Sequence, residues 1–328
     1  MRKQKVLLLH FKVMEKLSSK FHKYLQAVGT GPKGNRNLTQ AEMHDAMGMM
    51  LDGTAISEQT SAFLLGWRVA SESKDELLGA LKAMRERTKY TPVKNSLEIG
   101  YPLDGKTKAV PIMLLSAKML GRLPLVIHGD RAQPSKLGFN PKDFAENMKL
   151  SSNIHYFDRS HFLPELAKLT DLRRALGLRT AFNSIEKLHN VGKSPYALIG
   201  MFHMPYFDLY KELYENEYKR LVIVRGNEGS PEILKKTKIL VIEKGHSHSL
   251  PVDPAEFGLK AYKTDKELSL KEMIAILENP DELTLGYARL NAALMLYAAN
   301  KTPSIEEGFT KLKAAYDKLL KKSRGKED

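Results

Sequence analysis

The chain has 328 residues, of which 42% are apolar and 27% charged, a composition typical of globular proteins with a sizeable core. It has no cysteine, which excludes disulfides and thiolate chemistry, and no apolar run of the roughly 18 residues that a membrane helix needs. The 52 Lys and Arg exceed the 38 Asp and Glu, so the net charge is +14. That charge favours a polyanionic partner, although it could also serve only solubility. We expect a cytoplasmic protein with no membrane association.

The first 90 residues are expected to be almost entirely helical. Apolar spacing predicts a helix over residues 5–27, which is too basic and too short in apolar length for a secretory signal. A loop rich in Gly and Pro follows at residues 29–36. Thr39 and Glu42 form a Thr-x-x-Glu capping box that begins the next helix. That helix is expected to end at about residue 51. Two further helices are expected at residues 58–70 and 74–87.

The pattern changes near Pro92, where short apolar runs begin to alternate with helices. Strands are expected at residues 123–129, 221–226 and 238–243. Helices are expected at residues 110–120, 163–176, 271–277 and 283–299. Continuous apolar strands separated by helices are typical of a mainly parallel sheet covered on both faces. We therefore predict an α/β fold, with a small helical domain over residues 1–92 and a larger α/β domain over residues 93–328.

Two glycine-containing turns carry candidate phosphate contacts. Gly29-x-Gly31-x-x-Gly34 follows a helix and contains a proline, so it is not the dinucleotide fingerprint, which follows a strand. Lys33 and Arg36 make it a basic loop instead. Asp104-Gly105 precedes a helix, where Lys106 and Lys108 would strengthen anion binding. An ordinary connecting turn explains the second motif equally well.

Further basic residues lie at the ends of expected elements. His128-Gly129-Asp130-Arg131 ends a predicted strand, at the sheet edge where α/β proteins bind ligands, so Arg131 and Lys136 would face the ligand. Arg173, Arg174 and Arg179 cluster at a helix end, and arginine forks suit phosphate and carboxylate. In both places a solvated surface is the alternative. His246 and His248 are weak evidence for a metal site, and a flexible loop is the preferred interpretation.

These motifs, in this order, resemble the anthranilate phosphoribosyltransferase family, which shares its fold with pyrimidine nucleoside phosphorylases. The resemblance runs from about residue 24 to 318 and includes Asn291-Ala292-Ala293 and Ser304-x-x-Glu307-Gly308. It implies a helical domain that part of residues 160–190 rejoins, an active site between the domains, and a homodimer formed through the helical domain.

The active-site motifs depart from that family. The diphosphate loop, Gly-Thr-Gly-Gly-Asp-Gly in the family, is Gly100-Tyr101-Pro102-Leu103-Asp104-Gly105 here. The family's Lys-His-Gly-Asn-Arg has lost its lysine at Ile127. Its acidic Mg²⁺ pair aligns with Pro231-Glu232, which leaves Glu232 as a degenerate metal site. Arg173 matches the arginine that holds anthranilate. Phosphoribosyl transfer needs metal and amides on the leaving diphosphate, so these losses argue against it.

The departures resemble the YbiB-type homologues, which lack transferase activity and bind nucleic acid with little sequence preference. Asp104-Gly105-x-x-Lys108-x-x-Pro111 and Pro124-x-Val126-x-His128-Gly129 carry this resemblance. We predict a non-catalytic dimer that grips DNA or RNA in a basic inter-domain cleft, without a cofactor and with no catalytic residues. The expected phosphate contacts are Lys33, Arg36, Lys106, Lys108, Arg131, Lys136, Arg173, Arg174 and Arg179. Tyr101 is a weaker candidate for stacking on a base.

Two alternatives stay open. The first is a divergent phosphoribosyltransferase or nucleoside phosphorylase that uses phosphoribosyl diphosphate and Mg²⁺, favoured by retained His128, Arg131, Arg173 and Glu232. The second is a scaffold that binds only protein through its basic termini. Turnover of phosphoribosyl diphosphate would establish the first, and a protein complex that survives nuclease treatment would point to the second.

Overall fold

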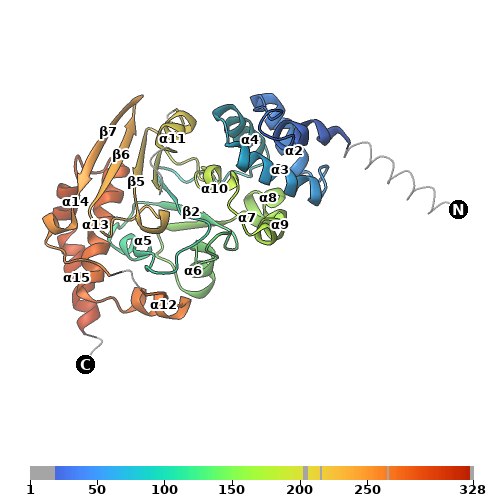
Figure 1. Ribbon diagram of the computed structural model, residues 1–328. Coiled ribbons are helices and arrows are strands. Elements are labelled where there is room, and N and C mark those ends of the chain that lie inside the picture. Colours follow the sequence, from blue (N-terminus) through green and yellow to red (C-terminus); the bar gives the residue numbers. More distant parts are fainter. Residues whose placement is uncertain (1–18, 202–205, 215, 264–265, 326–328) are drawn as a thin grey trace. The chain divides into compact units, whose positions relative to one another are not determined.

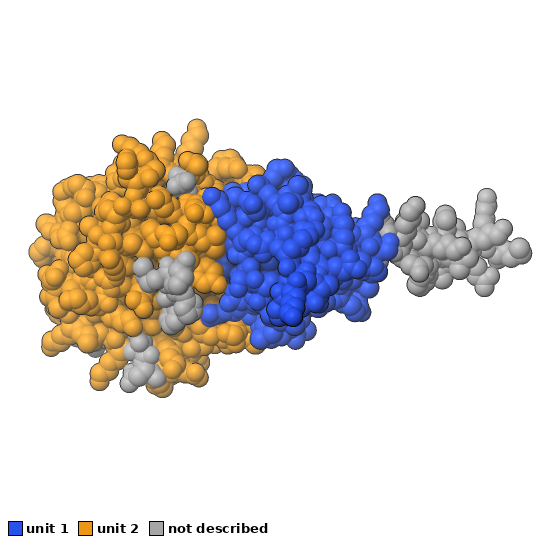
Figure 2. Space-filling view, turned by 45° about the horizontal axis from the view of Figure 1, so that its top comes forward, with its two compact units in different colours: residues 1–89, 163–186 blue, residues 90–162, 187–328 orange. Residues whose placement is uncertain are grey.

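The computed structural model describes residues 19–201, 206–214, 216–263 and 266–325. The chain folds as two compact units, coloured separately in Figure 2. Unit 1 comprises Met1–Lys89 and Leu163–Glu186, and unit 2 comprises Tyr90–Phe162 and Lys187–Asp328. The sequence-based boundary at residue 92 and the return of part of residues 160–190 to the helical domain stay predictions. Residues 1–18, which include much of the helix expected over 5–27, lie outside the described residues.

Unit 1 is helical, as its sequence pattern predicts. Residues 19–29 are helical, and the labelled helices are α2 (Gln40–Leu51), α3 (Ser57–Ala70), α4 (Lys74–Glu86), α8 (Pro164–Lys168), α9 (Thr170–Leu176) and α10 (Phe182–Ile185). The Thr39–Glu42 capping box is present at the start of α2. The region expected to be one helix over residues 163–176 is helical but divided in two, because α8 ends at Lys168 and α9 begins at Thr170.

A buried glutamate and a close helix contact organise the core of unit 1. Glu76 on α4 accepts hydrogen bonds from the Trp67 indole at 3.2 Å and from the Leu38 amide at 2.9 Å. Gly79 lets α2 approach α4, since a Cβ there would lie 2.3 Å from the Gln40 carbonyl oxygen. The loop before α2 is thereby fixed to α4.

Unit 2 contains one seven-stranded sheet in the order β3-β2-β1-β4-β5-β6-β7. Figure 1 labels its strands β2, β5, β6 and β7. The strands are β1 (Leu97–Gly100), β2 (Leu125–Gly129), β3 (Ile154–Asp158), β4 (Tyr196–Gly200), β5 (Arg220–Val224), β6 (Thr237–Glu243) and β7 (His246–Val252). Neighbours from β3 to β5 are parallel, whereas β6 and β7 pair antiparallel. The predicted α/β class with a small helical domain and a mainly parallel sheet is confirmed.

Helices pack against this sheet and connect its strands. They are α5 (Ile112–Ser116), α6 (Pro141–Asn147), α7 (Arg159–Phe162), α11 (Tyr206–Tyr214), α12 (Leu270–Glu278), α13 (Glu282–Ala298), α14 (Ile305–Lys311) and α15 (Lys313–Arg324). The apolar helix α13 packs on α5 and the sheet in one buried core. In the described part of the chain, no helix is long and apolar enough to cross a membrane.

Some local expectations differ from the structure. His246 and His248 lie on strand β7, not in a flexible loop, because they pair with β6 in a regular hairpin. The helix expected from residue 110 begins at Ile112, after Pro111. Strands β1, β3 and β4 are not among the strands predicted from the sequence.

Candidate functional site

The loop between β1 and α5, which aligns with the family's diphosphate loop, is packed into unit 2. Its residues Tyr101, Leu103 and Asp104 are buried. Gly105 has a φ of +76°, and a Cβ there would lie 2.3 Å from the backbone of Gly138. Tyr101 therefore cannot stack on a base from this position, and that expectation is wrong for the structure described.

The amides of this loop are already bonded within the protein. The Gly105 amide donates to the Pro102 carbonyl oxygen at 3.1 Å, and the Lys106 amide donates to the Phe139 carbonyl oxygen at 2.8 Å. The next two amides, of residues 107 and 108, both donate to the carboxylate of Glu228. Four consecutive amides are thus unavailable to a diphosphate.

A buried ion pair lies beneath the loop. The Lys106 ammonium has no solvent exposure, donates to the carboxylate of Glu232, and donates to the Val110 carbonyl oxygen at 3.1 Å. Glu232 also accepts from the Met113 amide at 2.9 Å and the Ser230 hydroxyl at 2.9 Å. Lys106 is therefore enclosed and cannot contact a phosphate in this structure.

Glu228 occupies a small anion site above that pair. Its carboxylate accepts from the Thr107 amide at 3.1 Å, the Thr107 hydroxyl at 3.2 Å and the Lys108 amide at 3.2 Å. Lys136 lies 3.5 Å from the same carboxylate and also donates to the Gly105 carbonyl oxygen at 3.1 Å. A group bound by consecutive amides and a lysine is bound as a phosphate would be. The Glu228 carboxylate therefore stands where an anionic ligand of this loop would be held.

The backbone and the pKa of Glu228 fit this position. Its φ of +53° is left-handed, a conformation that costs a non-glycine residue energy and persists where surrounding contacts hold it. Burial acts to raise the pKa of Glu228, but Lys136 and the amides of Thr107 and Lys108 outweigh it and lower the pKa. The carboxylate is therefore ionised at neutral pH.

The residues at this place do not fit the Mg²⁺ that the family implies. Glu232 is the one acidic residue retained from the metal pair, and its carboxylate is taken by Lys106, Met113 and Ser230. Within the residues that the structure describes, no group of three or more His, Asp or Glu side chains could hold a metal ion. A cationic ammonium lies on the carboxylate where the metal chemistry requires a free oxygen.

Three other predicted contacts lie on the loops of unit 2. Lys108 and Arg131 are exposed, and Lys136 is partly buried against Glu228. The Gln133 amide bonds the Leu103 carbonyl oxygen at 2.8 Å, which joins the loop of Arg131 to the loop of Lys108. The structure thus brings together the loops that carry Lys108, Arg131 and Lys136.

The remaining predicted contacts belong to unit 1. Arg173 is buried, and both oxygens of Glu186 accept from its guanidinium at 2.8 Å, so Arg173 cannot reach a phosphate either. Arg36 is exposed but forms an ion pair with Glu42 at 2.7 Å. Lys33, Arg174 and Arg179 are exposed.

The sequence does not indicate the roles of two residues at the site. No sequence pattern identifies Glu228 as a site residue, although it follows β5 at the carboxyl edge of the sheet, where ligand contacts gather. His128, retained from the family, is buried, and its ring packs edge-on against Phe162. Its nearest carboxylate is Glu98, 3.5 Å from Nε2. His128 is therefore a core residue of β2.

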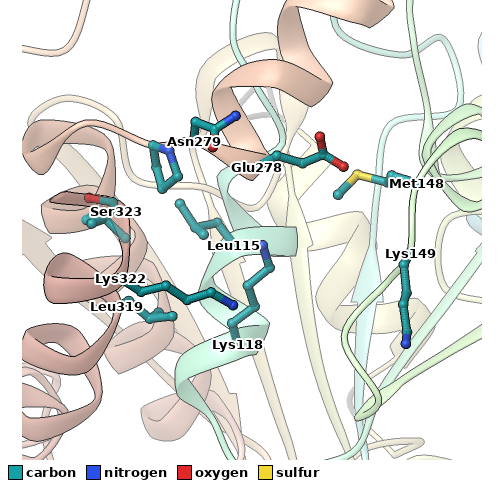
Figure 3. Close-up of a pocket in the computed structure, with 11 residues that line it drawn as sticks. Leu115, Lys118, Met148, Lys149, Glu278, Asn279, Leu319, Lys322 and Ser323 are labelled. Carbon is teal, nitrogen blue, oxygen red and sulfur yellow. The ribbon is translucent and has the colours of Figure 1, made fainter. Parts of the chain in front are cut away.

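A cavity of about 470 Å³ lies elsewhere on unit 2, among α5, α12, α13 and α15 (Figure 3). Lys118 and Lys322 extend into the same space, whereas Lys149 points away from them. Lys118 donates to the Leu277 carbonyl oxygen at 3.3 Å, at the end of α12. This lysine therefore caps a helix, and the cavity shares no residue with the loop described above.

Comparisons with known proteins match two domain models to the chain. The helical bundle domain of a glycosyl transferase family matches residues 22–88, and its a/b domain matches residues 135–318. An anthranilate phosphoribosyltransferase of Petrotoga mobilis is 30% identical over 317 residues, covering 88% of this chain and 90% of its own. The chain belongs to this glycosyl transferase family.

Two other relatives are similar to this chain over most of its length. An uncharacterized protein of Aquifex aeolicus is 30% identical over 286 residues, covering 83% of this chain and 91% of its own. An anthranilate phosphoribosyltransferase of Saccharolobus islandicus is 27% identical over 271 residues, covering 76% and 79%.

Solved structures support the fold. Anthranilate phosphoribosyltransferase from Thermus thermophilus has a TM-score of 0.70 at 21% identity and covers 92% of this chain and 97% of its own. The enzyme from Saccharomyces cerevisiae in complex with PRPP and Mg has a TM-score of 0.71 at 17% identity, covering 92% and 94%. At these identities the likeness concerns the fold alone.

Proposed function

We propose that this glycosyl transferase family member is a non-catalytic protein that binds nucleic acid through its phosphates. The observation that supports a non-catalytic protein is the pairing of Lys106 with Glu232 next to a loop whose amides are already hydrogen-bonded within the protein. Transfer of a sugar from a diphosphate needs those amides and a metal to stabilise the leaving charge. In this chain the Glu228 carboxylate accepts from two of the loop amides, and the Lys106 ammonium lies on the Glu232 carboxylate, where a metal would be needed.

The support for a phosphate polymer is electrostatic. The net charge is +14, and exposed cations remain on several loops after Lys106 and Arg173 are removed from the set. Those cations are Lys33, Arg36, Lys108, Arg131, Arg174 and Arg179, with Lys136 partly buried. Backbone phosphates repeat along a polymer, so separate cations can each bind one, and base identity then matters little.

The test is a binding series with single-stranded DNA, duplex DNA and RNA of equal length across salt concentrations. We expect affinity to fall steeply with salt, because each phosphate contact releases counterions. The variant K108Q/R131Q removes two exposed cations, and K238Q/K301Q removes two exposed lysines elsewhere on unit 2 as a matched control. The first should weaken binding to all sequences alike and flatten the salt dependence, while the control should not.

A second candidate function is phosphoribosyl transfer, and the comparisons favour it more directly than they favour nucleic-acid binding. Relatives named anthranilate phosphoribosyltransferase align over 76–89% of this chain. The same preparation should therefore be given phosphoribosyl diphosphate, anthranilate and Mg²⁺. Product formation that is lost in E232Q would establish the enzyme and overturn our proposal. No turnover together with salt-dependent binding would support it.

We also propose a homodimer formed through unit 1. Helix α3 exposes Leu65 and Val69, with 45% and 75% of their surfaces accessible, and Ala62 lies exposed one turn earlier. An apolar stripe of this kind is typical of an interface. Sedimentation should give twice the 37.0 kDa chain mass, and L65E/V69E should give the monomer. A monomeric wild type would contradict this part of the proposal.

A further inference from the structure

A second cavity on unit 2, of about 530 Å³, has aromatic and aliphatic walls. The 3-10 helix Pro254–Phe257 and the residues after it form one wall, and α13, α14 and α15 form the others. Its apolar lining residues are Phe257, Leu259, Leu283, Phe309 and Tyr316. This volume lies within the usual range for small-molecule sites, about 300–1,000 Å³. None of its residues belongs to the loop that contains Lys106.

Arg289, on α13, is held in one orientation at this cavity. Its Nε donates to the Phe309 carbonyl oxygen at 2.7 Å. Its guanidinium carbon lies 3.8 Å from the centre of the Phe309 ring and 5.4 Å from that of Tyr316. Contacts to two rings and a carbonyl fix the plane of the fork before any ligand arrives. Such preorganisation lowers the entropic cost of binding an anion.

The charged side chains that line the cavity give it a net positive charge. Glu282 is the acidic lining residue, and its carboxylate is bonded to Arg324 at 2.8 Å. Asp317 acts on Arg289 electrostatically but is bonded to Lys313 at 3.0 Å. Lys260 is a second, exposed cation of the lining. Two cations and one acid line the cavity.

Burial supports the same interpretation. It lowers the pKa of the Arg289 guanidinium from its ordinary value, and Asp317 and Tyr316 oppose the shift. A lowered pKa means that the charged form lacks full solvation at this position. An anion bound to the fork would supply that missing interaction.

We infer that this cavity binds a small organic acid, with its carboxylate on Arg289 and its apolar body against Phe257, Leu259 and Leu283. A guanidinium fork matches a carboxylate with two parallel hydrogen bonds. The single net positive charge of the lining suits a monoanion better than a phosphate dianion. This inference does not depend on nucleic-acid binding.

The test uses 3-phenylpropionate as the probe and its amide, 3-phenylpropionamide, as the uncharged control, with calorimetry on the whole protein. Saturable binding of the acid and none of the amide is expected. R289K keeps the charge but loses the fork, so it should weaken binding by about tenfold or more. K301Q, an exposed lysine outside the cavity, should leave affinity unchanged.

Three further outcomes decide the inference. Perturbed amide signals of Gly258, Gly286 and Phe309 in the wild type would support the site even if R289K fails to fold. Phenyl phosphate binding more tightly than the acid would overturn the assignment to a carboxylate. No saturable binding of the acid at about 10 mM, a concentration that detects even very weak affinity, would overturn the site itself.

Discussion

The Lys106 ammonium donates to the Glu232 carboxylate where neither side chain has any exposure to solvent. Lys106 comes from the loop after β1 and Glu232 from the loop after β5, so the pair joins loops that follow two interior strands of the sheet, 126 positions apart in sequence. In this glycosyl transferase family member, a lysine thus contacts the acidic residue that the sequence resemblance implies for the metal pair. The pair closes the loop, and it makes the stability of the loop depend on both partners.

Replacing Lys106 should therefore destabilise unit 2. In K106M the Glu232 carboxylate stays buried without its cation, and breaking a buried pair in this way typically costs about 3–5 kcal/mol. Denaturant unfolding should show this loss, whereas K108M, two residues further along the same loop and at an exposed position, should change stability by less than about 0.5 kcal/mol.

The double variant K106M/E232L separates the ion pair from simple packing. Removing both charges avoids an unpaired buried group, so this variant should be more stable than K106M. A double variant as unstable as the single one would show that the pair does not set the stability of the loop. Activity with phosphoribosyl diphosphate and Mg²⁺ in K106M, if it appeared, would mean that the lysine blocks a functional metal site.

Glu228 should make stability depend on pH in a defined direction. Its folded-state pKa is lowered, so its contribution is present above the ordinary pKa of 4.5 and is lost as pH falls through the lower, folded value. The stability difference between wild type and E228Q should be largest near neutral pH and shrink in acid. Unfolding free energies at pH 7 and in the acid range measure it. A difference that grows in acid would have the wrong sign.

The sequence predicts much of the fold because local patterns dominate there. The Thr39–Glu42 capping box, the apolar run that becomes β2 and the long apolar segment that becomes α13 are each local signals. The predicted helix over residues 163–176 is two helices in the structure, because α8 ends at Lys168 and α9 begins at Thr170. Strand β1 is too short for its alternation to be recognised.

The site is harder to predict, because burial of a charge depends on residues distant in sequence. Lys106 and Arg173 look like exposed phosphate contacts by residue type and position. Lys106 instead meets Glu232, and Arg173 meets Glu186 inside unit 1. Nothing in the residues around Lys106 indicates a partner 126 positions away, so sequence spacing alone could not separate it from exposed Lys108.

The last prediction concerns Arg36, the predicted phosphate contact that is exposed and paired. Both Arg36 amino groups donate to the Glu42 carboxylate, at 2.9 and 2.7 Å. Hydrogen bonds from Arg36 and the Thr39 amide lower the pKa of Glu42 to about 2, so the pair persists at neutral pH. E42Q should release Arg36, and if the loop over residues 29–36 binds phosphate, nucleic-acid affinity should rise.

E42Q should also cost little stability, since glutamine can replace glutamate in a capping box and exposed ion pairs contribute about 0–1 kcal/mol. The comparison that decides is E42Q against E42Q/R36Q in the same salt series. Tighter binding in the first that disappears in the second assigns the gain to the released guanidinium. Equal affinities in the two would remove Arg36 from the set of phosphate contacts, because removing its charge would then leave nucleic-acid affinity unchanged.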